Sequence, residues 1–250
     1  MSVVVMIRWV STPLVLLHGF TNTGASWDRV VAALGERYRP LAPDIRGHGS
    51  AADRRPVTLE AVTDDISRLA PNALTLAGYS MGGRLALHLA FALAPRITRL
   101  VLIGASPGLA DPVQRAARRE ADERLADELR QLTIEQFARR WAQTPVLGGQ
   151  PPAVQAAVTA DRLRNTPAGL AAALRGLGTG ALTSLWDRLG ELETPVVLIV
   201  GERDHKFRAT AEQMLAALPS ARLDVVPGAG HAVHLEAPAA VAEIIRDTSR

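Results

Sequence analysis

The sequence predicts an α/β fold: a mostly parallel sheet flanked by helices, with an inserted all-helical cap. Three patterns support this prediction. Short apolar runs bounded by turn residues alternate with longer helical patterns, as in chains whose parallel strands are connected by helices. The apolar runs are continuous, which is typical of strands covered on both faces. The alternation stops between about residues 108 and 189, where the periodic segments are all helical.

The strands and helices of the sheet region are expected in alternating order. Each strand candidate is a short run, such as LVLLH or VVLIV, and the longer periodic patterns lie between these runs. The strand candidates are Leu14–His18, Tyr38–Pro43, Ala73–Ala77, Leu100–Gly104, Val196–Val200 and Leu223–Val226. The helix candidates are Ser26–Leu34, Leu59–Leu69, Met81–Leu93, Ala209–Leu218 and Pro238–Ile245.

The central segment is expected to form a helical cap over the sheet. Asp111 followed by Pro112 is typical of an N-cap and a first helical residue. The predicted division is a core of residues 1–107 and 190–250, with a cap of residues 108–189 inserted into it. The cap helices are expected at Pro112–Leu132, Ile134–Gln143, Ala153–Arg164 and Ala168–Leu177.

The composition excludes several classes of protein. With 250 residues, of which 48% are hydrophobic and 21% charged, the chain can bury a core and is not intrinsically disordered. No apolar stretch reaches the ~18 residues of a membrane helix, and residues 1–11 lack the basic start of a signal peptide. The absence of cysteine excludes disulfides and thiolate chemistry, so a cytoplasmic protein is expected.

The charge distribution does not suggest a nucleic-acid partner. Lys and Arg total 28 against 25 Asp and Glu, which leaves a net charge of +3. Lys206 is the only lysine, and the arginines are scattered among acidic residues without a basic run or a basic–aromatic pattern. We therefore expect a small-molecule substrate and neither a nucleic-acid nor a membrane partner.

A nucleophile motif lies between a predicted strand and a predicted helix. The residues are Gly78-Tyr79-Ser80-Met81-Gly82, directly after the run ALTLA and before RLALHLAFALA. A sharp strand–turn–helix connection crowds the backbone, so it needs small residues on both sides of the serine. The turn also aims a helix N-terminus at the serine hydroxyl. The motif predicts that Ser80 is a catalytic nucleophile or proton carrier at a nucleophile elbow.

A base and an acid are expected from two later loops. His231 follows the last predicted strand in a glycine-flanked loop, where an α/β sheet presents active-site groups. His234 is the alternative base. Asp204 follows the run VVLIV, with Glu202 as the alternative acid. The chain order serine, aspartate, histidine favours a Ser80–Asp204–His231 triad, in which the carboxylate orients the imidazole.

Two backbone amides are candidates for an oxyanion hole. The sequence His18-Gly19-Phe20 follows the first predicted strand, and Met81 directly follows the serine. In sheets of this kind, an amide from the loop after an early strand and the amide after the nucleophile stabilise negative charge on the substrate oxygen. The Phe20 and Met81 amides are therefore expected to act as the two donors.

These motifs together resemble the α/β-hydrolase superfamily over the whole chain. The HGF loop, the segment DIRGHG at residues 44–49, the elbow, GERD at 201–204 and GAGH at 228–231 recur at the usual positions of the superfamily. The cap resembles a narrower family, the 2-succinyl-6-hydroxy-2,4-cyclohexadiene-1-carboxylate synthases of menaquinone biosynthesis. The similarity lies in SPGL at 106–109, QRAAR at 114–118, FARRWAQTPV at 137–146, RLRN at 162–165 and GERDHKF at 201–207.

The family resemblance implies a cofactor-independent lyase. In that family the triad eliminates pyruvate from an anionic cyclohexene carboxylate instead of hydrolysing an ester. No metal or organic cofactor is expected. Carried over to this sequence, the resemblance implies that Arg84, Arg118 and Arg164 bind substrate carboxylates. It also implies that Tyr79 and Trp141 line the pocket.

The residues themselves support two of these arginines. Arg118 is expected on the apolar face of its helix, where an unpaired charge is costly. It is expected to bind an anion in the cleft, with an internal pair to Asp122 as the alternative. Arg84 lies in the first turn of a helix, where a cation opposes the helix dipole and needs another reason to be present. Arg164 has no such signal, and a surface position is its alternative.

Three functions are compatible with these residues. The first is a lyase acting on a polyanionic small molecule. The second is a carboxylesterase or C–C bond hydrolase with the same triad, and the third is a non-catalytic small-molecule receptor. Dehalogenase and epoxide-hydrolase chemistry is disfavoured, because those relatives have an aspartate where this chain has Ser80.

Overall fold

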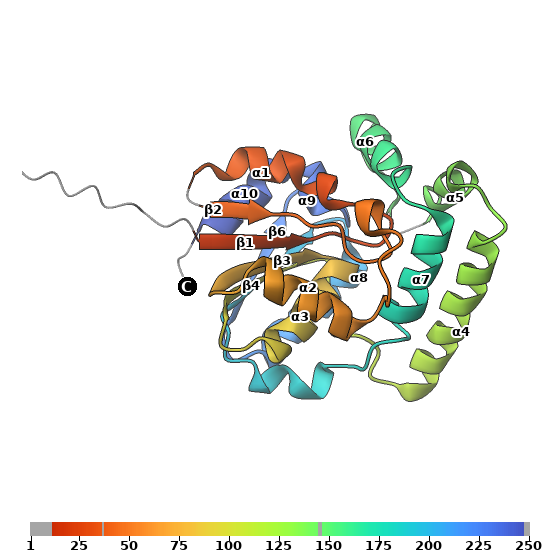
Figure 1. Cartoon of the computed structure of the whole chain (residues 1–250). Coiled ribbons are helices and arrows are strands. Elements are labelled where there is room, and N and C mark those ends of the chain that lie inside the picture. Colours follow the sequence, from red (N-terminus) through yellow and green to blue (C-terminus); the bar gives the residue numbers. More distant parts are fainter. Residues whose placement is uncertain (1–11, 37, 145–146, 248–250) are drawn as a thin grey trace, which may run out of the picture.

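The computed structural model describes residues 12–36, 38–144 and 147–247, and it confirms the predicted α/β-hydrolase fold. The expectation of no signal peptide concerns residues 1–11 and lies outside these residues. The described sheet has six parallel strands in the order β2-β1-β3-β4-β5-β6 (Figure 1). They are β1 (Thr12–Leu17), β2 (Tyr38–Leu41), β3 (Leu74–Tyr79), β4 (Ile97–Ile103), β5 (Val196–Gly201) and β6 (Ala221–Val226).

Helices cover both faces of the sheet. One face packs against α2 (Leu59–Leu69), α3 (Met81–Ala92) and α8 (His205–Ala217). The other packs against α1 (Asp28–Leu34), α9 (Val233–Glu236) and α10 (Pro238–Arg246). Short 3₁₀ turns are η1 (Gly24–Trp27), η2 (Gly49–Ala51) and η4 (Trp186–Glu191).

The continuous apolar runs are explained by two separate cores. Side chains alternate between the faces of a strand, so neighbouring residues enter different clusters. In β1, Val15 and Leu17 join the α2–α3–α8 core, whereas Leu14 and Leu16 join the α1–α10 core. All four side chains are fully buried. A strand covered on both sides therefore shows no polar alternation.

The cap lies over the carboxyl ends of the strands, toward which their arrows point in Figure 1. It contains α4 (Pro112–Leu129), α5 (Ile134–Trp141), α6 (Pro152–Arg162) and α7 (Pro167–Leu177), with no strand in the part of the cap that is described. Asp111 caps α4 as predicted, because its carboxylate accepts from the Val113 amide at 2.7 Å. The helices α4 and α7 pack side by side around Ala126, Leu129 and Leu174.

The structure changes some predicted boundaries. The helix expected from Ala209 begins at His205, because the Asp204 side chain caps it through the Phe207 amide. The one-turn helix α9 and the turn η4 were not predicted, since segments this short show no 3.6-residue periodicity. No helix among residues 12–36, 38–144 and 147–247 is long and apolar enough to cross a membrane.

Candidate active site

The turn that carries Ser80 is crowded and strained. β3 ends at Tyr79, α3 begins at Met81, and Ser80 has φ 51° and ψ −109°, a conformation that non-glycine residues rarely adopt. A Cβ on Gly78 would lie 2.3 Å from the Gly82 carbonyl oxygen. A Cβ on Gly82 would lie 2.2 Å from the carbonyl oxygen of Leu17 in β1. Both glycines are therefore required for α3 to approach the end of the sheet so closely.

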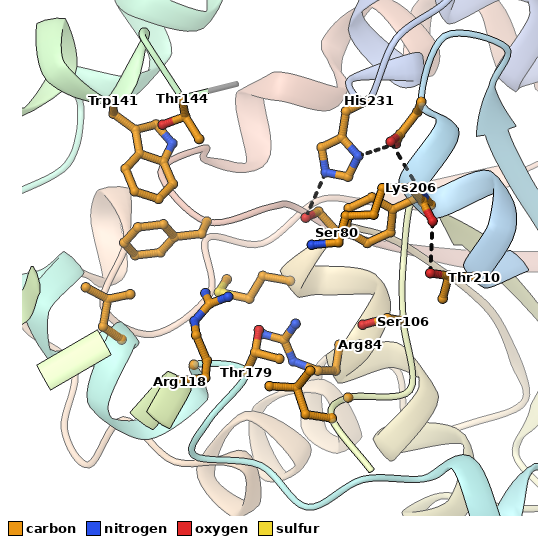
Figure 2. A pocket seen from close by; sticks show the side chains of 18 of the residues that line it. Ser80, Arg84, Ser106, Arg118, Trp141, Thr144, Thr179, Lys206, Thr210 and His231 are labelled. Atoms are coloured by element: carbon orange, nitrogen blue, oxygen red, sulfur yellow. Dashed lines mark hydrogen bonds and ion pairs between the residues drawn. The ribbon is translucent and has the colours of Figure 1, made fainter. Parts of the chain in front are cut away.

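The structure brings Ser80, His231 and Asp204 into one hydrogen-bonded chain (Figure 2). His231 Nε2 lies 3.2 Å from Ser80 Oγ, and its Nδ1 lies 2.6 Å from Asp204 Oδ2. His231 and Asp204 are only 5% and 6% exposed, so solvent hardly competes for these contacts. The geometry suits a hydroxyl whose proton passes to an imidazole that a carboxylate holds in place.

The two alternative residues have different surroundings. Glu202 is exposed, and its carboxylate accepts from the Gly228 amide at 2.8 Å. His234 is completely buried in α9, with its ring centroid 4.2 Å from that of Tyr79 and 4.7 Å from that of Trp27. Burial lowers the pKa of His234 to about 3. Among the described residues, the Ser80 hydroxyl has a hydrogen bond to His231 and none to either alternative.

His18 orients the peptide that contains the Phe20 amide. The Ile45 amide donates to His18 Nε2 at 2.9 Å, so the ring proton is on Nδ1, which lies 2.9 Å from the Gly19 carbonyl oxygen. Burial lowers the pKa of His18, which keeps the ring neutral. The Gly19 carbonyl and the Phe20 N–H belong to the same planar peptide, so this bond also directs the Phe20 amide.

A cavity of about 870 Å³ separates the triad from the cap. Ser80, His231, Phe20 and Met81 lie on its wall, so the residues that carry both predicted amide donors line the same cavity as the serine. Trp141 enters from the cap, with its ring centroid 5.2 Å from that of Phe20. This volume is within the range typical of pockets for small molecules.

Tyr79 does not reach the cavity wall. It is 4% exposed, and its ring lies 5.2 Å from the His231 ring, between that histidine and His234. Burial raises the pKa of Tyr79. The expected pocket-lining role is therefore replaced by a supporting contact beneath His231, because the side chain leaves β3 toward the α1–α10 core.

Arg84 and Arg118 converge on the cavity from the core and the cap (Figure 2). Arg84 is 7% exposed and donates through Nη2 to the Leu177 carbonyl oxygen at 3.2 Å. Its Nε has no hydrogen-bond partner among the described residues. Burial, and then the charge of Arg118, lower the pKa of Arg84 to about 10. An anion in the cavity would offset the burial of the Arg84 charge and its repulsion from Arg118.

Arg118 combines the two alternatives that its sequence position left open. Its Nε donates to Asp122 at 2.8 Å, and the side chain also lines the cavity. Its side chain is 46% exposed, so it is not at the centre of a buried apolar face as predicted. The packed face of α4 is instead formed by Asp122, Ala126 and Leu129, because α4 packs mainly against α7.

Arg164 lies outside this cavity, contrary to the prediction. Its side chain is 64% exposed, lies 3.9 Å from Asp161, and borders a separate depression beside Ser50. Arg162, two residues earlier, is the arginine of α6 that is buried, at 2% exposure. The helix α6 ends at Arg162, so Arg164 lies in the turn that follows and not on the packed face of the helix.

Lys206, Phe207 and Trp186 also line the cavity, although the sequence did not single them out as site residues. The Phe207 ring packs 4.4 Å from the His231 ring and lies beside the Lys206 ammonium. Lys206 could have been recognised, because it is the only lysine of the chain and lies in the first turn of α8. No group of three or more His, Asp or Glu among the described residues is arranged to hold a metal ion.

Comparison with known proteins identifies the family. A model described as "Alpha/beta hydrolase family" matches residues 14–244. A putative 2-succinyl-6-hydroxy-2,4-cyclohexadiene-1-carboxylate synthase of Bacillus subtilis is 36% identical over 95% of this chain and 90% of its own length. A synthase of the same name from Enterobacter is 33% identical, covering 95% and 91%. The chain belongs to this synthase family of alpha/beta hydrolases.

Solved structures agree with this assignment. The structure of MenH from S. aureus has a TM-score of 0.89 and 30% identity, covering 94% of this chain and 92% of that one. A thermophilic esterase from Thermogutta terrifontis has a TM-score of 0.83 and 27% identity, covering 94% and 88%. The fold is therefore shared by the synthase family and by esterases, so the residues of the cavity must distinguish the reactions.

Replacing Ser80 or His231 with alanine should lower turnover by about four orders of magnitude or more, because members of a triad act as a unit. Circular dichroism should show unchanged folding. Asp204→Asn should also be severely impaired, whereas the matched variant Glu202→Gln should keep most of the activity. A folded His231→Ala protein with near-normal turnover would contradict the triad assignment.

The protein should lose stability as the pH falls below about 6.5. Burial lowers the pKa of His48 and His234 to about 3, that of His88 to about 4, and that of His18 as well. Unfolded histidine takes up its proton near pH 6.5, so the unfolded state binds more protons below that pH. The free energy of unfolding should therefore decrease by up to about 1.4 kcal/mol per pH unit for each buried histidine.

Urea unfolding at pH 8, 7, 6 and 5 measures this dependence. The exposed residue His205 offers the control substitution His205→Gln, because its side chain is not buried in the folded state. If the free energy of unfolding stays constant from pH 7 to pH 5, the folded and unfolded states bind the same number of protons. That result would contradict the expectation that the buried histidines stay neutral in the folded protein.

Proposed function

We propose that this protein is a lyase of menaquinone biosynthesis that eliminates pyruvate from an anionic cyclohexene carboxylate. The product would be 2-succinyl-6-hydroxy-2,4-cyclohexadiene-1-carboxylate, the compound named in its relatives. The observation that carries the proposal is the pair Arg84 and Arg118 facing a Ser80–His231–Asp204 triad across one cavity. Two converging guanidinium groups favour a substrate with several carboxylates.

The proposed reaction begins with removal of a proton beside a substrate carbonyl. Ser80 takes that proton while its own proton passes to His231, and Asp204 stabilises the imidazolium that forms. Negative charge then develops on an enolate-like oxygen, which the Phe20 and Met81 amides would stabilise. The electron pair moves into the ring as a new double bond, the ring carbon–oxygen bond breaks, and pyruvate leaves as its enolate. That enolate takes up the proton held by the His231 imidazolium, which gives pyruvate and restores the triad.

The arginines also explain why an elimination is favoured over ester hydrolysis. A multiply anionic substrate held by Arg84 and Arg118 places additional negative charge next to cations when the proton is removed. A neutral ester would leave the buried Arg84 guanidinium without an anion, because among the described residues Arg118 has a carboxylate partner in Asp122 and Arg84 has none. The cytoplasmic location expected from the cysteine-free sequence is part of the same proposal.

A carboxylesterase is the second candidate function. It is favoured by the intact triad and by the similarity to the Thermogutta terrifontis esterase. An esterase would pass through an acyl group on Ser80 and would consume water, whereas the proposed elimination needs neither. This difference makes the two functions separable by experiment.

The purified protein should release pyruvate from the cyclohexene precursor and should hydrolyse neutral aryl esters poorly. A lactate dehydrogenase coupled assay measures pyruvate, and stopped-flow absorbance measures aryl ester cleavage. No burst of phenol release is expected, since no acyl-enzyme accumulates. Fast ester hydrolysis with a burst, together with no pyruvate from the precursor, would establish the esterase function instead.

Lysine should replace Arg84 or Arg118 poorly. A single ammonium cannot reproduce the directional, paired donors of a guanidinium, so kcat/KM for pyruvate release should fall about 10- to 100-fold. Arg164→Lys serves as the matched control and should stay within about twofold of wild type, because its side chain lies outside the cavity. Equal losses in all three variants would contradict this placement of the substrate.

A further inference from the structure

The carboxyl end of α6 carries buried polar side chains that the proposed reaction does not use. Asp161 is 7% exposed, Arg162 2% and Asn165 4%. None of the three lines the cavity that contains Ser80. Buried charges and amides are costly unless they are hydrogen-bonded, so their partners indicate why they are present.

All three side chains bind the loop that follows β1. The Asp161 carboxylate accepts from Asn22 Nδ2 at 3.2 Å, from the Thr23 amide at 2.9 Å, and from the Thr23 hydroxyl. Asn22 is 139 positions and Thr23 is 138 positions away from Asp161 in the chain. One carboxylate of the cap therefore holds two consecutive residues of the core.

The neighbouring residue Thr21 is held by the same helix end. Arg162 Nε donates to Thr21 Oγ1 at 3.3 Å, and Asn165 Nδ2 donates to the Thr21 carbonyl oxygen at 2.9 Å. Thr21 has φ 70°, a left-handed conformation that costs a β-branched residue energy. Such a conformation persists only where the surroundings impose it.

This loop is connected directly to the proposed oxyanion hole. The Asn22 amide donates to the Gly19 carbonyl oxygen at 3.1 Å. That carbonyl shares a trans peptide with the Phe20 N–H, and the two point in opposite directions in one plane. The position of Asn22 therefore helps to determine where the Phe20 N–H points, and the position of Asn22 depends on Asp161.

We propose that Asp161 is a positioning residue that sets the oxyanion hole from the cap. The carboxylate holds Asn22 and Thr23, Asn22 holds the Gly19–Phe20 peptide, and that peptide presents its N–H to the oxygen that becomes negative. His18 supplies the second bond to the same carbonyl from the core side. The inference rests on the proposed triad and its oxyanion donors, and it extends them by coupling the docking of α6 to catalysis.

Two substitutions at this position test the inference in the full-length protein. Asp161→Ala removes every acceptor, whereas Asp161→Asn keeps the shape and one carbonyl acceptor. Val158→Ala is the matched control, because Val158 lies one turn earlier in α6, is 5% exposed and packs in the α1–α10 core without contacting the loop through hydrogen bonds. It loosens the same helix and leaves Asp161 in place.

The first measurement uses an alkyl fluorophosphonate, which does not require the proposed substrate. Ser80 Oγ forms a bond to phosphorus, fluoride leaves, and the serine proton passes to His231, while negative charge on the phosphoryl oxygen needs the oxyanion donors. Mass spectrometry follows the labelling rate. Loss of one donor typically lowers such rates by about 10²–10³. We expect Asp161→Ala to slow labelling at least tenfold, Asp161→Asn to slow it less, and Val158→Ala to match wild type.

The second measurement separates positioning from general loosening of the cap. For pyruvate release, kcat should fall in Asp161→Ala and partly recover in Asp161→Asn, with KM nearly unchanged, because the oxyanion forms only in the transition state. A loosened cap would instead raise KM, since Arg118 and Trp141 belong to the cap. Thermal unfolding of each variant identifies those that remain folded.

Each outcome decides the inference. Slower labelling in the Asp161 variants without any pyruvate release from wild type would support the positioning role and refute the proposed lyase function. Wild-type labelling in a folded Asp161→Asn or Asp161→Ala protein would overturn the positioning role, as would equal slowing in Val158→Ala. A wild-type protein that the probe does not label would also overturn it, because a formed oxyanion hole beside the triad serine must react.

Discussion

The close approach of α3 to the end of β1 is the constraint on which the active site depends. Gly82 lies against the Leu17 and His18 carbonyl groups, and a Cβ there would come within 2.2 Å of backbone. This contact allows the strained turn at Ser80 and places the Met81 amide beside the HGF loop. Without it, the two predicted oxyanion donors would belong to separate parts of the molecule.

Burial around this contact determines which histidine can act. His18, His48 and His234 are all fully buried, and burial lowers the pKa of each, so they remain neutral. His231 differs because it adjoins the open cavity and has Asp204 on its other side. The neutral histidines support the site by packing and hydrogen bonding, whereas His231 has both a proton donor and a charge partner within reach.

The cap contributes charge and alignment as well as cover. Burial lowers the pKa of Arg84, and Arg118, a second cation opposite it, lowers that pKa further. The same cap presents Asp161 to the loop beside the triad. A cation pair is costly in an empty cavity and favourable around a polyanion, so substrate charge and cap position are physically linked. The proposed lyase function depends on this linkage.

The sequence by itself determined the alternation of strands and helices, the helical cap and the elbow. These are local patterns: the strand LVLLH, the N-cap Asp111 and the crowded Gly78–Gly82 turn follow from neighbours in the chain. The chain order also pointed to Ser80, Asp204 and His231. The fold was therefore almost fully predictable, apart from the one-turn helix α9 and the position at which α8 begins, His205.

The tertiary structure alone decided which side chains meet. Ser80 and His231 are 151 positions apart, and Asp161 and Thr23 are 138 apart, so no local period places either pair together. The same limit applies to Arg164, which the family resemblance placed in the cavity: it lies in solvent beyond the end of α6, while Arg162 is buried. A helix pattern determines only relative faces, and the face that is buried is chosen by the packing of distant elements.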